Sequence, residues 1–204
     1  MYESDKNRVI NLIDNFILVL ETRLLPTFEN IEIEAKEIEQ RRLEDLSLNF
    51  NPDIMDEADC YEDAYFTGLK HYEIYTEMKQ SVLNMSSVWL YHIFEKESDI
   101  IFSDKKWKER KLKLSKLSIP LIAPSNFYKI DKELQSICNI NKHGNGDSQK
   151  ALFKIRPDLF ETKTFSTKEY LKNISFIQIK EYAENIKLFW IEVYEQVQKS
   201  KLSI

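Results

Sequence analysis

The chain has 204 residues, of which 43% are hydrophobic and 31% charged, and its formal net charge is −5. This length favours one domain with a substantial core, and the charge balance excludes a protein that is basic overall, though not a local basic surface. Only 3 glycines and 5 prolines occur, which favours long helices over many short strands. Cys60 and Cys138 are too few for a disulfide framework and lack zinc-site spacing, so we expect a reducing compartment and no metal or cofactor.

The N-terminal region does not resemble a targeting segment. The first residues are polar and of mixed charge, unlike a signal peptide. The apolar stretch 10–25 contains Asp14, Glu21 and Arg23, which is unsuitable for crossing a bilayer. We therefore expect a soluble, cytoplasmic protein that does not enter a membrane.

Apolar residues at three- and four-residue steps predict an all-α chain with long helices. We expect a single domain over 1–204, with N-terminal helices in 1–58 and a core in 59–200. The predicted helices cover residues 4–25, 27–47, 59–102, 104–117 and 126–143. A short helix is predicted to follow 147–148, and the last helix includes 179–193. The segment 48–58 is predicted to be a loop, and 157–176 to hold at most a short β-hairpin.

The helix predicted over 59–102 has the widest apolar stripe. Val82, Met85, Trp89 and Ile93 share one face, and three further residues widen it, Leu83, Leu90 and Phe94. A stripe this wide is typical of a central helix, so we expect Trp89 and Phe94 to be buried. Gly68 is a position where the helix could be interrupted.

The segment from Asn139 to Gly146 is the most suggestive chemically. Asn139 and His143 are four residues apart and share a helical face, and Lys142 lies at its edge. An amide, an ammonium and an imidazole at one helix end can hold a phosphate and transfer a proton. Gly144 and Gly146 allow the backbone to leave the helix near a ligand. An ordinary helix end, with a histidine in the last turn and a glycine after it, explains the same pattern.

Two other groups of residues are open to two interpretations. Trp107 lies within a basic run that could follow a nucleic-acid backbone or form a solvated helix face near the acidic residues of 29–59. The cations of this run are Lys105, Lys106, Lys108, Arg110, Lys111, Lys113 and Lys116. His92 and Glu95, one turn apart, could orient His143 or make an interior hydrogen bond. His71 is expected to serve packing.

Three segments resemble HEPN-like helical proteins of prokaryotes. They are ELQSICNINKHGNGDSQKALFKIRPDLF, SSVWLYHIFEKESDIIF and IKEYAENIKLFWIEV, which together cover roughly residues 80–195. The superfamily is similar in having an arginine, a polar residue that is often asparagine, and a histidine a few residues later. Asn139 and His143 match this motif, whereas Cys138 occupies the position of the arginine.

The resemblance implies an all-α helical bundle, HEPN-like, with long antiparallel helices. It also implies a dimer in which two motifs face each other across a cleft. Active members of the superfamily resemble metal-free ribonucleases and act as toxins or antiphage defence effectors, some with a partner protein of a toxin or defence operon. On this basis we expect RNA as a partner, with His143 as the acid or base and Asn139 and Lys142 beside it. A thiol cannot replace a guanidinium as a phosphate clamp. A non-catalytic HEPN-like binding or dimerisation module is therefore the alternative.

Overall fold

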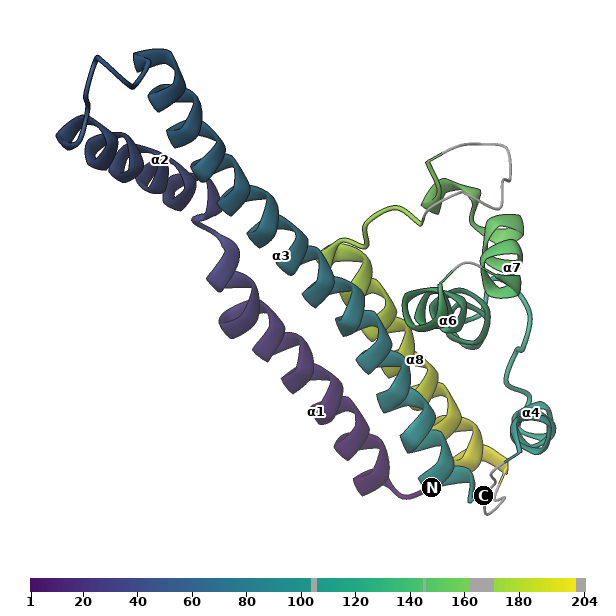
Figure 1. Cartoon of the computed structure of the whole chain (residues 1–204). Helices are drawn as coiled ribbons and strands as arrows, with labels where there is room; N and C mark the ends of the chain where they lie inside the picture. The colour runs from purple at the N-terminus through teal and green to yellow at the C-terminus, as the bar shows by residue number, and fades with distance from the viewer. Residues whose placement is uncertain (104–105, 145, 162–170, 201–204) are drawn as a thin grey trace. The chain divides into compact units, whose positions relative to one another are not determined.

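The computed structural model describes residues 1–103, 106–144, 146–161 and 171–200. Within these residues the chain is helical and contains no strand, so the prediction of an all-α protein is confirmed. The α-helices are α1 (Glu3–Val19), α2 (Ile31–Leu48), α3 (Glu57–Phe102), α4 (Trp107–Lys116), α5 (Asn126–Tyr128), α6 (Gln135–His143), α7 (Asp147–Ile155) and α8 (Phe176–Ser200) (Figure 1). Short π-helical turns cover Leu20–Leu24 and Lys129–Leu134, and 3-10 turns cover Leu25–Phe28 and Pro157–Leu159.

The chain divides into two compact units. The larger comprises Met1–Leu18 and Leu83–Ile204, and the smaller comprises Val19–Val82. This division differs from the boundary at residue 58 expected from the sequence. The reason is that α1 packs within the larger unit, while the first half of α3 pairs with α2 in the smaller one.

The smaller unit is a helical hairpin of α2 and the first half of α3. Arg42 pairs with Asp63 at 2.5 Å, and the His71 ring lies 3.3 Å from the Glu34 carboxylate. Because the later residue of α2 meets the earlier residue of α3, the two helices are antiparallel. Helix α3 runs through Gly68 without the interruption that we considered from the sequence. A Cβ atom at Gly68 would lie 2.7 Å from the Ala35 carbonyl oxygen, so glycine permits the close approach of the two helices.

In the larger unit, α1 lies beside the second half of α3 (Figure 1). An ion pair also joins α1 to α8. Arg8 pairs with the buried carboxylate of Glu97 at 2.6 Å, and Asp14 pairs with Lys187 of α8 at 2.9 Å. Two ring contacts extend this order, Phe16 with Trp89 and the Lys6 ammonium over Tyr194. Helix α1 is therefore antiparallel to both neighbours, and α3 and α8 run in the same direction. Parallel neighbours need a long connection, which the segment 103–175 provides.

The core of the larger unit is aromatic. Phe94 of α3 meets Phe189 and Trp190 of α8 at ring-centroid distances of 5.5 and 6.1 Å, and Phe127 lies 5.7 Å from Phe189. All four side chains are fully buried. The residues of α8 that the sequence placed on one face are also buried, namely Ile179, Tyr182, Ile186, Phe189, Trp190 and Val193. The predicted core face of the last helix is thus confirmed.

The prediction that Trp89 is buried is wrong, because 58% of its surface is exposed. Phe94, Leu83 and Leu90 are buried as expected. The buried face of α3 is shifted around the helix toward Ser86 and Ser87, whose small side chains allow neighbouring helices to come close. Hydrophobic spacing alone did not separate the two overlapping stripes, and Met85 and Trp89 were left on the solvent side.

Two remaining expectations concern the hairpin and the membrane. The segment 157–176 shows an isolated antiparallel bridge between Phe160 and Leu171, and the tip of any hairpin falls in residues 162–170, outside the described part of the chain. Among the described helices, none combines the length and apolar character needed to cross a membrane.

Candidate functional site

Helix α6 carries the candidate motif and ends where the sequence predicted. The preceding turn begins at Ser125, whose hydroxyl accepts a hydrogen bond from the Tyr128 N–H at 3.1 Å. A continuous helical path then leads to His143. Gly144 has a φ of 77°, a backbone conformation that favours glycine, and its N–H donates to the Ile140 carbonyl at 2.8 Å. The helix stop and an exposed histidine at its end are therefore both present.

A polar contact and an apolar face hold α6 in place. Ile137, Cys138 and Ile140 are buried. Toward α3, the Asn141 amide donates to the Ser87 hydroxyl at 3.0 Å and to the Asn84 carbonyl at 3.3 Å. Since both acceptors lie on the second half of α3, these bonds fix how the last turn of α6 meets that helix. The sequence had not singled out Asn141 for this part.

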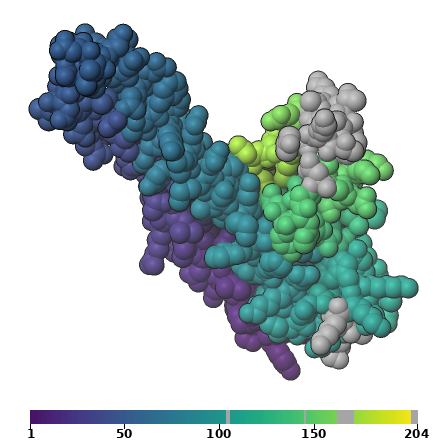
Figure 2. Space-filling model, viewed as in Figure 1, coloured from purple at the N-terminus to yellow at the C-terminus, as the bar shows by residue number. Residues whose placement is uncertain are grey.

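Lys142 joins the two helices at the surface. Its ammonium lies 3.4 Å from His92 Nε2, and His92 Nδ1 lies 3.3 Å from the Glu95 carboxylate. The arrangement that satisfies both contacts has Nδ1–H donating to Glu95 and Nε2 accepting from Lys142. All three side chains are exposed, and the surfaces of α3 and α6 lie next to one another on one face of this unit (Figure 2). We call Glu95, His92 and Lys142 the polar cluster.

Cys138 lies beneath this cluster with no exposed surface. Burial raises the pKa of its thiol, while the Lys142 ammonium acts in the opposite direction and Glu95 raises it further. The pKa of Tyr91 on α3 is also raised, first by burial and then by the negative charge of Glu95. The position that carries arginine in the HEPN-like motif is therefore an interior position in this chain, occupied by a protonated thiol at neutral pH.

His143 and Asn139 lie on the outer side of α6. His143 is exposed next to Lys142, and Asn139 is partly buried one turn earlier. Neither side chain has a hydrogen-bond partner among the described residues. His92 and Glu95 were considered from the sequence as supports for His143. In the structure they contact each other, and His92 contacts Lys142. Gly146 precedes α7, and Asn145 lies outside the described residues.

Three cations of the basic run on α4 have acceptors within the fold. Arg110 is buried and pairs with Asp99, and Lys113 donates to the Phe102 carbonyl at 2.8 Å. Lys111 pairs with the buried carboxylate of Asp131 at 2.9 Å, and the same carboxylate accepts from Trp107 Nε1 at 2.6 Å. These side chains fasten α4 to the bundle rather than facing solvent.

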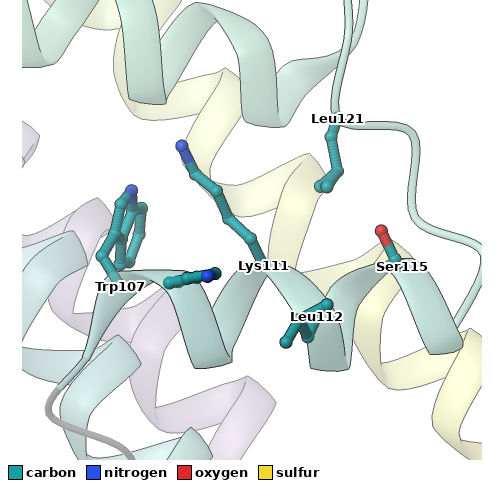
Figure 3. Close-up of a pocket in the computed structure, with 6 residues that line it drawn as sticks. Trp107, Lys111, Leu112, Ser115 and Leu121 are labelled. Atoms are coloured by element: carbon teal, nitrogen blue, oxygen red, sulfur yellow. The ribbon is translucent and has the colours of Figure 1, made fainter.

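The remaining surface of α4 is a shallow groove. Trp107 and Lys111 point to the same side of the helix, and Leu121 faces them from the following segment (Figure 3). Trp107 also stacks on Phe127 at a centroid distance of 6.0 Å, so its ring serves the core. Lys106 and Lys108 are exposed, and Lys105 lies outside the described residues.

Comparison with known proteins adds no assignment. No protein-family model matches the chain, and neither does any curated protein or solved structure. Among the described residues, no group of three or more His, Cys, Asp or Glu side chains is arranged to hold a metal ion.

Proposed function

We propose that this chain is a metal-independent, HEPN-like endoribonuclease whose reacting groups lie at the meeting point of α3 and α6. The observation that carries the proposal is the polar cluster, in which a carboxylate orients an imidazole and an ammonium lies 3.4 Å from the other ring nitrogen. His143 is exposed beside Lys142 on the same helix end. Two of the three histidines in the chain thus flank one lysine.

This set of groups suits cleavage of RNA by its own 2′-hydroxyl. The 2′-oxygen attacks the neighbouring phosphorus, so that a P–O2′ bond forms and the P–O5′ bond breaks. One imidazole takes the proton of the 2′-hydroxyl, and the other gives a proton to the leaving 5′-oxygen. The products are a 2′,3′-cyclic phosphate and a 5′-hydroxyl end.

We assign the base to His92, whose ring is paired with Glu95, and the acid to His143. Glu95 holds the His92 ring through its Nδ1–H, as the carboxylate of a catalytic triad does for its imidazole. Nε2, which faces the Lys142 ammonium in the free protein, can accept the proton once that ammonium turns to the phosphate. Lys142 has further N–H groups that can donate to the phosphate oxygens while charge builds up on them. Asn139, on the face of His143, supplies an amide for the same phosphate.

The wider role follows from the resemblance alone. It predicts a homodimer in which two motifs share a cleft, activity as a toxin or antiphage effector in the cytoplasm, and a partner protein from the same operon. Light scattering at micromolar concentration tests the dimer. A clean monomer that still cleaves RNA would remove the shared cleft from the proposal.

The alternative is a non-catalytic HEPN-like binding or dimerisation module. The complete burial of Cys138 favours it, because the arginine that clamps phosphate in the motif is absent and its position does not reach the surface. In that case the polar cluster would bind a partner without chemistry.

Incubation of the purified chain with a labelled single-stranded RNA distinguishes the ribonuclease from the non-catalytic module. We expect cleavage with cyclic phosphate ends that continues in the presence of a chelator. His92→Ala and His143→Ala should each lower the rate by about 10²–10⁴-fold. His71→Ala is the matched control, since this histidine belongs to the smaller unit and contacts Glu34. Equal rates in all three variants, or no cleavage by the wild-type chain, would exclude the catalytic proposal.

A further inference from the structure

Trp89 is an exposed tryptophan next to the polar cluster. Its exposed fraction is 58%, whereas Trp190 is fully buried and Trp107 is partly buried and hydrogen-bonded to Asp131. The Phe16 ring lies 6.4 Å away at an interplanar angle of 51° and supports the indole on one side. Single exposed apolar side chains are common on protein surfaces, so this indole is of interest for the functional groups that lie beside it.

The position of Trp89 on α3 relates it directly to the polar cluster. His92 follows it by three residues, so the two side chains are neighbours on the helix surface. Lys96 follows His92 by one turn, is exposed, and has no ion-pair partner among the described residues. One exposed face of α3 therefore presents an indole, an imidazole and an ammonium in succession, with Lys142 of α6 at its side.

The charges on this face limit what it can bind. Glu95 points its carboxylate to His92, and Asp99 is paired with Arg110, so both acids already have cationic or donor partners. Lys96 and Lys142 remain available to an anion. A flat aromatic surface beside such cations matches a nucleotide of a single strand, whose base stacks while its phosphate meets the lysines.

We propose that Trp89 is the stacking platform for a base of single-stranded RNA whose phosphate lies at the polar cluster. This inference rests on the proposed ribonuclease function and specifies its substrate as unpaired RNA. A paired base cannot reach the indole, because its faces are covered by its neighbours in the duplex. Trp89 is a positioning residue, since it holds the nucleotide and takes no part in proton transfer.

Binding of a 2′-O-methyl single-stranded oligonucleotide tests the platform without cleavage, because the nucleophile is blocked. We expect the oligonucleotide to quench tryptophan fluorescence of the wild-type chain, and the same strand in a duplex to do so far less. Trp89→Ala should weaken binding by about 5- to 100-fold, the range typical of one base stacked on an aromatic ring. Trp89→Phe should keep much of the affinity, and Ile100→Ala, another exposed apolar position on α3, should keep all of it.

The outcomes distinguish this inference from the function beneath it. If the wild-type chain cleaves RNA but Trp89→Ala binds and cleaves equally well, the platform is excluded and the ribonuclease stands. If Trp89→Ala alters the oligomeric state in sedimentation and leaves oligonucleotide binding unchanged, the exposed indole serves association of two copies and the platform is again excluded. If the wild-type chain neither binds nor cleaves single-stranded RNA, both proposals fail.

Discussion

The basic run of α4 and the end of α6 were both candidates for binding nucleic acid, and they differ in how their cations are paired. In α4 the cations Arg110, Lys111 and Lys113 are bound to acceptors inside the fold. At the end of α6, Lys142 remains at the surface and meets a histidine instead of an acid. The run that is richer in charge thus has three of its cations bound within the fold, whereas Lys106, Lys108 and Lys116 are exposed. A positive charge contributes to a ligand site only where the fold has not already neutralised it.

The difference has an energetic side. A buried carboxylate such as Asp131 requires donors around it, and α4 supplies two of them, Trp107 and Lys111. Removing these donors would leave an uncompensated charge. The polar cluster is exposed, so its hydrogen bonds compete with water and contribute little to folding. Substitutions in the two regions should therefore separate stability from activity.

Among the contacts of α4, the largest effect on stability is expected at Asp131. Asp131→Ala leaves the Trp107 N–H and the Lys111 ammonium without their acceptor, and the free energy of unfolding should fall by about 3 kcal/mol. Urea denaturation measures this change. Glu109→Ala removes an exposed acid 3.8 Å from Lys106 and should stay within about 0.5 kcal/mol of the wild type. Equal stability of the two variants would mean that α4 is not fastened through Asp131.

Cys138→Arg introduces the residue type that the proposed HEPN-like resemblance expects at this position, and it should nevertheless be harmful. The position has no exposed surface, and the Lys142 ammonium nearby repels a second cation. We expect a loss of about 2–4 kcal/mol of stability, measured by thermal or urea unfolding, without a gain in RNA cleavage. Cys138→Ala is the control for the lost thiol. A stable and more active arginine variant would show that the side chain finds a path to the surface.

Lys142 should matter for activity and not for folding. Lys142→Ala removes the cation beside His92, and RNA cleavage should fall by about 10-fold or more, as expected for one lost charge-assisted hydrogen bond. The unfolding free energy should change by less than about 0.5 kcal/mol, because the side chain is exposed. Lys108→Ala in α4, also exposed, is the control and should cleave normally. A similar loss in both variants would restore α4 as part of the interface.

The smallest effect on stability is expected at Trp89. Trp89→Ala should change the unfolding free energy by less than about 0.5 kcal/mol, since most of the indole faces solvent. Trp190→Ala in the aromatic core should cost about 3–5 kcal/mol in the same measurement. A large fall in the unfolding free energy of Trp89→Ala would mean that the indole stabilises the packing of α1 through Phe16. That result would count against Trp89 as a binding platform.

Much of the fold could be predicted because helical signals are local. Spacing, the Ser125 cap and Gly144 located the helix that ends at His143, and the apolar repeat identified the buried face of α8. The candidate site was predicted only in part. His92, Glu95 and Lys142 were named, but their connection was not, because α3 and α6 meet through tertiary packing. Asn141 and Cys138 carried no signal beyond their position in the motif.

Local sequence patterns were enough to predict that the chain is helical and where its long helices lie. They also identified the segment that carries Lys142 and His143 side by side. These properties depend on residues within a few positions of one another, so they can be read along the chain. Three features depend on tertiary packing. Packing selects which of two overlapping apolar stripes on α3 is buried, and it pairs Lys111 and Arg110 of α4 with Asp131 and Asp99. It also brings Lys142 of α6 next to His92 of α3. Each of these three features depends on which helices become neighbours in space. Contacts between segments far apart in the chain produce no periodic pattern in the sequence from which they could be predicted.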